Sequence, residues 1–341
     1  MSKEKVKRPW WLKLIVVVLI VVGSLSIVLG GAVMYFRLSV ADYYDNSTAA
    51  FKIPDFNAGF IAQGLDYDQK SDSFLVSGYM NNKSASPVYV VENSTGEAVK
   101  KVFLKEPDGE VYKGHSGGVA VHGDYFYVAS SEVYVYSYTA LKNAASGDYL
   151  DCLGSVKGIE DEENGLRASY VTTNGNNLVI GEFYREKNYQ TPASHKFNTT
   201  AGDYCQAVAI SFEFDSHGTL GLKEKPNAAY SLPDLAQGMC FNGDEVYVSC
   251  SYAVAFSDIC KYSLDKADTG ATFTFLGEDL PLYELDSASL TKKYKIAPMS
   301  EELAYVGGKV YVMCESASDK YIFGKLTGGE WCYATDFNKM K

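Results

Sequence analysis

Residues 237–249, QGMCFNGDEVYVS, contain the pattern that decides the fold of this 341-residue chain. A short, mostly apolar segment leads into the turn Asn242-Gly243-Asp244, and a second segment of β-branched and aromatic residues follows. Asn-Gly tolerates the positive φ angles of tight type I′ turns, so the stretch predicts a β-hairpin.

The same pattern occurs five times along the chain. The other copies begin at Gln63, Gly117, Ser169 and Glu301, each with a polar or glycine-containing turn before a stronger second strand. Third strands are predicted at 88–91, 133–136, 208–212, 259–262 and 321–323, and fourth strands at 99–104, 152–156 and 273–276. Repeated four-stranded units are typical of a β-propeller, in which each sheet covers the faces of its neighbours.

The sequence therefore predicts an all-β domain with five blades, or six if the long loops 184–204 and 277–298 conceal a degenerate blade. Closing the ring needs a strand from one end of the domain beside the other end, and residues 51–56 or 331–337 could supply it. A β-sandwich is the alternative, although a sandwich does not require a recurring hairpin pattern.

An apolar segment precedes the repeats. Residues 14–36 contain no charge, and roughly 20 such residues are enough to cross a bilayer as a helix. Basic residues precede the segment and aromatic residues flank it, which predicts a cytoplasmic N-terminus and an extracytoplasmic remainder. We expect a cytoplasmic segment 1–13, a transmembrane signal anchor 14–36, a linker 37–54 and a propeller domain 55–341. A cleavable signal peptide ending at Ser39-Val40-Ala41 is the alternative.

Charge and cysteine content restrict the partners. The chain has a net charge of −11, and residues 1–37 carry +5, which leaves −16 for the rest. So acidic a domain is not expected to bind nucleic acid, whose phosphates require a basic face. The seven cysteines form no CxxC pair and mostly lie in predicted strands, where we expect buried free thiols.

In each repeat, a polar residue stands in an otherwise apolar segment at the position where the innermost strand is predicted to begin. In a propeller these points surround one end of the central channel, so we expect a ligand-binding site there. The residues are Gln63, His115, Ser169, Gln237, Glu301 and Glu302, with Tyr79, Glu182, Tyr252 and Glu315 at the ends of second strands.

His115 lies between glycines that let backbone approach closely. Together with Glu301 or Glu302 it could act in acid–base catalysis or hold a divalent cation, although no complete metal-ligand set is recognisable. The alternative is that these side chains only satisfy buried backbone groups and water. His195 and His217 lie in polar, loop-like segments and are expected to face solvent.

The motifs Gln63-Gly64-Leu65, 115–119, Gln237-Gly238-Met239 and Glu301-Glu302-Leu303 resemble those of extracytoplasmic β-propellers such as the NHL, YVTN and SMP-30/gluconolactonase-like groups. The resemblance covers roughly residues 55–337. It implies a metal site of carboxylates and Asn at the channel mouth of the gluconolactonase-like members, but only the Glu301-Glu302 copy carries a carboxylate there.

Two functions follow as hypotheses. The first is a membrane-tethered propeller that binds a ligand, a surface protein or a carbohydrate at the cell surface, with loop tyrosines suited to such contacts. The second is a hydrolase or lactonase-like enzyme that uses His115, Glu301 and Glu302 at the channel mouth, with or without a divalent cation.

Overall fold

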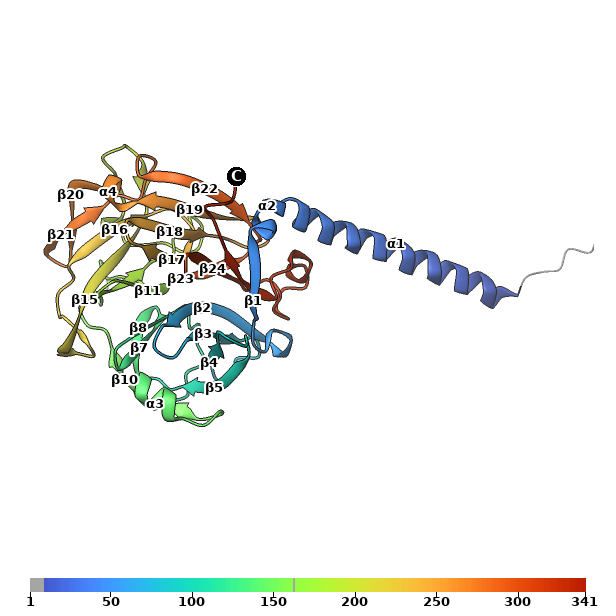
Figure 1. Cartoon of the computed structure of the whole chain (residues 1–341), viewed down its shortest axis with the longest axis horizontal. Coiled ribbons are helices and arrows are strands. Elements are labelled where there is room, and N and C mark those ends of the chain that lie inside the picture. The colour runs from blue at the N-terminus through green and yellow to red at the C-terminus, as the bar shows by residue number, and fades with distance from the viewer. Residues whose placement is uncertain (1–8, 162) are drawn as a thin grey trace, which may run out of the picture.

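Five β-sheets surround a central axis in the computed structural model, which describes residues 9–161 and 163–341 (Figure 1). The first blade contains β2 (Phe60–Asp68), β3 (Ser73–Met80), β4 (Pro87–Glu92), β5 (Ala98–Leu104) and the short β9 (Tyr149–Leu150). The second contains β6 (Gly118–His122), β7 (Tyr125–Ser130), β8 (Glu132–Ser137) and β10 (Cys152–Ser155). The fourth contains β17 (Ala236–Asn242), β18 (Glu245–Cys250), β19 (Ser257–Ser263) and β22 (Leu290–Ile296).

The third blade is the widest. Its strands are β11 (Tyr170–Asn174), β12 (Asn177–Gly181), β15 (Ala207–Thr219) and β16 (Ala228–Leu232), and the hairpin of β20 (Asp268–Phe275) and β21 (Glu278–Tyr283) extends it outward. A separate hairpin of β13 (Phe197–Asn198) and β14 (Tyr204–Cys205) lies in the long loop between β12 and β15. The short helices are α3 (Tyr138–Asn143), α4 (Leu264–Ala267), η1 (Phe56–Ala58) and η2 (Ala193–His195).

Strands from both ends of the domain close the ring. The fifth blade contains β23 (Ser300–Val306), β24 (Lys309–Cys314) and β25 (Trp331–Thr335), and β1 (Ser47–Lys52) pairs antiparallel with β25 as its outermost strand. The innermost strand β23 packs against β2 of the first blade, so the five sheets form a continuous ring. The five-bladed fold is therefore confirmed, and residues 37–54 contain one of its strands rather than a linker alone.

The glycines of the repeated motifs lie where inner strands approach one another. A Cβ atom on Gly118 would lie 2.6 Å from the backbone nitrogen of Val171, and one on Gly238 would lie 2.5 Å from Cα of Glu302. Because real Cβ atoms are not found so close to backbone, any side chain at these positions would force the blades apart. The motif glycines are thus a packing requirement of the channel.

Two strand predictions were wrong. Residues 321–323 form no strand; the segment after β24 is an irregular loop ending in η3 (Gly324–Thr327), and β25 takes the third place in the fifth blade. Residues 273–276 do not complete the fourth blade, because β20 joins β21 on the third sheet and β22 fills the outer place. Strand composition alone does not identify the pairing partner, which depends on packing between distant segments.

The N-terminal helix α1 (Trp10–Leu38) extends away from the propeller (Figure 1). None of its residues is buried, and its length and composition fit a single membrane span or a signal sequence. The helix α2 (Ala41–Asp45) follows and leads directly into β1. Val40 and Tyr43 at this junction are buried in an apolar cluster with side chains of the fourth and fifth blades. All seven cysteines are free thiols.

Candidate functional site

A cavity of about 770 Å³ lies at one end of the central channel, and all five blades contribute to its wall. Nine of the ten polar residues that the repeats placed around one mouth line this cavity. They are Gln63, Tyr79, His115, Ser169, Glu182, Gln237, Tyr252, Glu301 and Glu315. The tenth, Glu302, is buried and does not line it.

Two carboxyl groups from the fifth blade face the cavity. Glu301 is only 3% exposed, and among the described residues its carboxyl has no hydrogen-bond partner. Burial, together with the negative charges of Glu315 and Glu302, raises the pKa of Glu301 well above its usual range. Burial also raises the pKa of Glu315 to about 7, against the opposing effects of Tyr321, Lys320 and Gln63. The cavity wall thus offers two carboxyl groups with raised pKa values, of which Glu315 titrates near neutrality.

The amide of Gln63 positions one of these carboxyls. Its Nε2 atom donates to Glu315 Oε2 at 2.9 Å and to the Ala62 carbonyl oxygen at 2.9 Å. Gln63 lies on β2 and Glu315 directly follows β24, so this hydrogen bond joins the first and fifth blades across the ring closure. Glu315 also lines the cavity, next to Tyr321 and Lys320.

His115 stacks on an aromatic ring, whereas the sequence suggested that it pairs with a glutamate carboxyl. Its imidazole and the Tyr79 ring have centroids 3.7 Å apart and an interplanar angle of 23°. Burial, and secondarily the nearby charge of Lys320, lowers the pKa of His115, so the ring is neutral at physiological pH. Lys320 Nζ donates to the Tyr79 hydroxyl and lies over the rings of Tyr79 and Tyr321. These rings and the Lys320 cation form one side of the mouth.

Glu302 acts within the channel rather than at its mouth. Its Oε2 atom accepts hydrogen bonds from the backbone N–H of Leu65 at 2.7 Å and of Val119 at 3.0 Å. Burial raises the pKa of this carboxyl well above its usual range. The expectation that Glu302 faces a ligand is therefore corrected: Glu301 and Glu302 are consecutive on β23, where successive side chains point to opposite sides, and only Glu301 lines the cavity.

His195 is buried, contrary to the expectation of solvent exposure. It is 1% exposed, and its Nδ1 atom lies 3.0 Å from Glu182 Oε2 while Nε2 lies 3.1 Å from the Asn164 carbonyl oxygen. Glu182 Oε2 also accepts from the backbone N–H of Val208 at 3.2 Å. The polar composition of the long loop suggested an exposed His195. The loop instead folds back at η2, over the third blade, and buries this side chain.

An aromatic wall from that long loop completes the mouth. The ring of Tyr189 makes an edge-on contact with Phe183 at a centroid distance of 5.2 Å, and the Arg185 guanidinium lies 3.8 Å above the ring centroid of Tyr252. Sequence reasoning missed Lys320 and Tyr321 as mouth residues because it assigned residues 321–323 to a strand. The glycines at 324, 328 and 329 close to these residues were the available signal for a loop.

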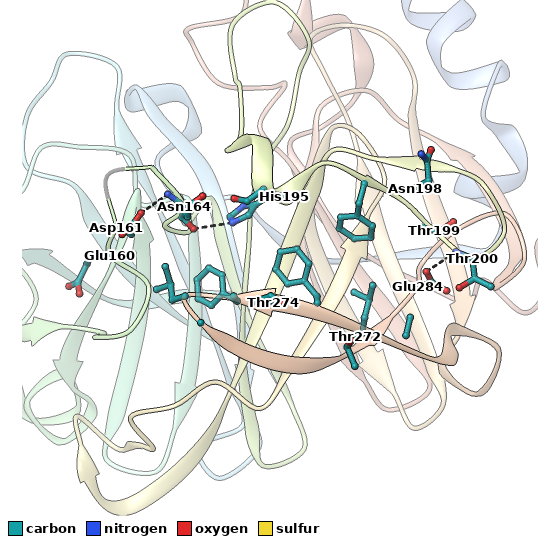
Figure 2. Close-up of a pocket in the computed structure, with 18 residues that line it drawn as sticks. Glu160, Asp161, Asn164, His195, Asn198, Thr199, Thr200, Thr272, Thr274 and Glu284 are labelled. Atoms are coloured by element: carbon teal, nitrogen blue, oxygen red, sulfur yellow. Dashed lines mark hydrogen bonds between the residues drawn. The ribbon is translucent and has the colours of Figure 1, made fainter.

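A second, larger cavity of about 1080 Å³ lies between the loop 193–200 and the β20–β21 hairpin. Figure 2 shows His195 and Asn164 on one side of it, Thr200 and Glu284 on the other, and Thr272 and Thr274 on the strand below. Glu284 accepts a hydrogen bond from the Thr200 backbone N–H at 2.8 Å, so its carboxyl is already paired. We take the channel mouth as the candidate site because all five blades and nine of the ten polar residues that the repeats predicted meet there.

Among residues 9–161 and 163–341, no group of three or more His, Cys, Asp or Glu side chains is placed to hold a metal ion. No protein-family model matches the sequence, and no curated protein matches it.

Several solved structures resemble the chain at low identity. Glutaminyl cyclase of Myxococcus xanthus has 10% identity and a TM-score of 0.39, over 78% of this chain and 90% of that one. A luciferin-regenerating enzyme has 12% identity and a TM-score of 0.42, over 84% and 94%. Hydrazine synthase of Kuenenia stuttgartiensis has 14% identity and a TM-score of 0.40, over 74% and 80%. Likenesses this distant carry no information about the activity of this chain.

Proposed function

We propose that this protein is a membrane-tethered, extracytoplasmic β-propeller that binds a carbohydrate at the mouth of its central channel. The observation that carries the proposal is the Glu301 carboxyl, which lines the cavity and makes no side-chain hydrogen bond to another described residue, so a ligand can pair with it. A typical hydrogen bond contributes about 0.5–1.5 kcal/mol net. A ligand hydroxyl that pairs with this carboxyl would gain that energy.

The rest of the wall fits a polyhydroxylated ligand. The amide of Gln237 can donate and accept, and Gln63, whose Nε2 is already bonded to Ala62 and Glu315, offers its carbonyl oxygen as an acceptor for hydroxyl groups. Aromatic rings, including Tyr189 and Tyr252, provide flat apolar faces with polar edges, which suit the alternating surfaces of a sugar ring. The wall carries acidic side chains together with the cations Arg167 and Lys320, so neither sign of charge dominates, which suits a neutral ligand.

Two features support a membrane tether: the helix α1 and its junction with the propeller. All of α1 lies outside the folded core, as a lipid-facing helix would. The alternative cleavage site, Ser39-Val40-Ala41, overlaps Val40, which is buried with Tyr43 in the core of the propeller. Cutting there would remove part of that packing, so an uncleaved anchor fits the structure better. The basic residues before the helix favour an extracytoplasmic propeller.

A glycan array probed with the full chain in lipid nanodiscs tests the proposal. We expect binding to a restricted set of neutral glycans, with loss of those signals in Glu301→Ala and Gln63→Ala. Thr272→Ala, which changes the second cavity, is the matched control and should bind as the parent does. Binding that survives both mouth variants, or an array without signals, would contradict the proposal.

A hydrolase or lactonase-like activity at the same mouth is the second candidate. One observation favours it: Glu315, with a pKa of about 7, shares the cavity with Glu301, whose pKa burial also raises, and a carboxyl that titrates near neutrality suits general acid–base catalysis. Assays of lactone and glycoside substrates across the range from mildly acidic to mildly alkaline pH, with and without added divalent cations, test this candidate. Turnover that Glu315→Gln abolishes would support it, and turnover that this variant leaves unchanged would exclude this site.

A further inference from the structure

Two apolar loops lie beside the end of α1. The first contains Val254 and Phe256, and the second contains Ile322 and Phe323 just before η3. Ile322 is 79% exposed, Phe323 74% and Val254 47%. Large apolar side chains this exposed cost free energy in water and usually mark a surface that contacts something apolar.

Side-chain contacts place both loops at the level where α1 ends. The Phe256 ring lies 5.9 Å from the Tyr35 ring and 5.7 Å from the Phe36 ring, measured between centroids. The helix η3 lies against α1, and Figure 1 shows this part of the fifth blade next to the propeller-proximal end of α1. Tyr35 and Phe36 close the apolar segment, where aromatic residues mark the boundary between hydrocarbon and headgroups.

We propose that these two loops dock into the outer leaflet of the membrane that α1 spans, so that the propeller rests on the bilayer through Val254, Phe256, Ile322 and Phe323. This inference rests on the membrane tether of the proposed function. A bilayer is the occupant that the structure favours, because the apolar surface continues directly from an apolar helix of spanning length.

Basic side chains at the edge of the patch fit the same occupant. Lys295 is exposed and its Nζ atom lies 3.9 Å from the ring centroid of Phe256, and the Arg37 guanidinium lies 4.3 Å from that of Tyr44. Cations next to apolar side chains at this depth meet lipid phosphates. The propeller as a whole is acidic. Positive charge at this edge therefore favours an orientation in which this side of the propeller faces the lipid headgroups.

Docking also sets the position of the candidate site. Tyr252 and Ala253 of the first loop, and Lys320 and Tyr321 of the second, line the channel mouth. The mouth therefore opens beside the bilayer, and a ligand reaches it along the membrane surface.

Quenching by brominated lipid tests this docking in the full chain. The substitution Phe323→Trp is made in a parent in which the native Trp10, Trp11 and Trp331 are all replaced by phenylalanine, so that only the new indole emits. The protein is reconstituted into vesicles of phosphatidylcholine and phosphatidylglycerol, with and without dibrominated phosphatidylcholine. Interfacial apolar side chains sit about 5–10 Å into the boundary between headgroups and acyl chains, so bromine atoms on the acyl chains should quench the new indole.

The matched control is Leu153→Trp in the same parent. Leu153 is an exposed residue of β10, which lies far from α1 in Figure 1, so an indole at this position should not be quenched. Circular dichroism confirms that both variants fold. A second parent, in which only Trp331 is replaced, reports on the tether through the native Trp10 and Trp11 at the start of α1.

The outcomes separate docking from tethering. Quenching of the indole at position 323 without quenching of the indole at position 153 supports the inference. Quenching of neither, or of both equally, overturns it, provided that Trp10 and Trp11 are quenched in the second parent and the tether is therefore intact. If those native tryptophans are not quenched, the tether itself fails and the inference fails with it.

Discussion

Replacement of Glu302 by leucine should destabilise the propeller by about 2–6 kcal/mol. The carboxyl accepts hydrogen bonds from the backbone N–H groups of Leu65 on β2 and Val119 on β6, in a channel that is closed to solvent. Each buried donor that loses its acceptor costs about 1–3 kcal/mol, and leucine leaves two of them unpaired. Glu302→Gln is the matched control, because one amide oxygen can replace Oε2 as the acceptor of both bonds.

Urea unfolding of the full chain in detergent micelles, followed by far-ultraviolet circular dichroism, measures the difference. We expect Glu302→Leu to lower the midpoint strongly and Glu302→Gln to stay close to the parent. The reasoning would be refuted by a leucine variant as stable as the parent, since the two N–H groups would then not depend on this acceptor. A glutamine variant as unstable as the leucine variant would show that an acceptor oxygen alone does not account for the role of this carboxyl.

Three further predictions concern stability. Because the pKa of Glu315 is raised from 4.5 to about 7, the folded state retains a proton that the unfolded chain releases, and stability should fall as pH rises through this window. The loss of unfolding free energy is at most about 3 kcal/mol. Glu315→Gln should remove this pH dependence, so melting temperatures measured below pH 4.5, between 4.5 and 7, and above 7 should vary less in this variant than in the parent. Gly118→Ala should cost about 1–3 kcal/mol by overpacking against Val171, and an unchanged urea midpoint would contradict this. Phe51→Ala should cost about 3–5 kcal/mol, because Phe51 on β1 is buried against Phe74. Lys52 is exposed on the same strand, so Lys52→Ala should cost under about 1 kcal/mol. Equal losses of stability in the two variants would argue against ring closure by β1.

Much of the fold was readable from short sequence patterns. Turn residues and alternating apolar positions act over fewer than about ten residues, so the five hairpins that begin each blade were predicted within a few residues of their observed bounds. The candidate site was partly readable for the same reason. Equivalent points of a repeated unit come together around an axis, and residues such as Gln63, His115 and Gln237 line one cavity.

The remaining features depended on contacts between segments far apart in the chain. The β20–β21 hairpin extends the third blade rather than completing the fourth, and β1 pairs with β25 from the opposite end of the domain. His195 is drawn inward by Glu182, and the loop after β24 brings Lys320 to the mouth.

By itself, the sequence determined the repeated β-hairpins, the apolar N-terminal helix and the acidic surface, because local backbone preference and hydrophobicity are properties of neighbouring residues. Only the tertiary structure decided which carboxyl faces the cavity and which supports the channel. Glu301 and Glu302 are adjacent and chemically identical, and their roles differ because one side chain meets the cavity while the other meets backbone N–H groups of β2 and β6 inside the channel.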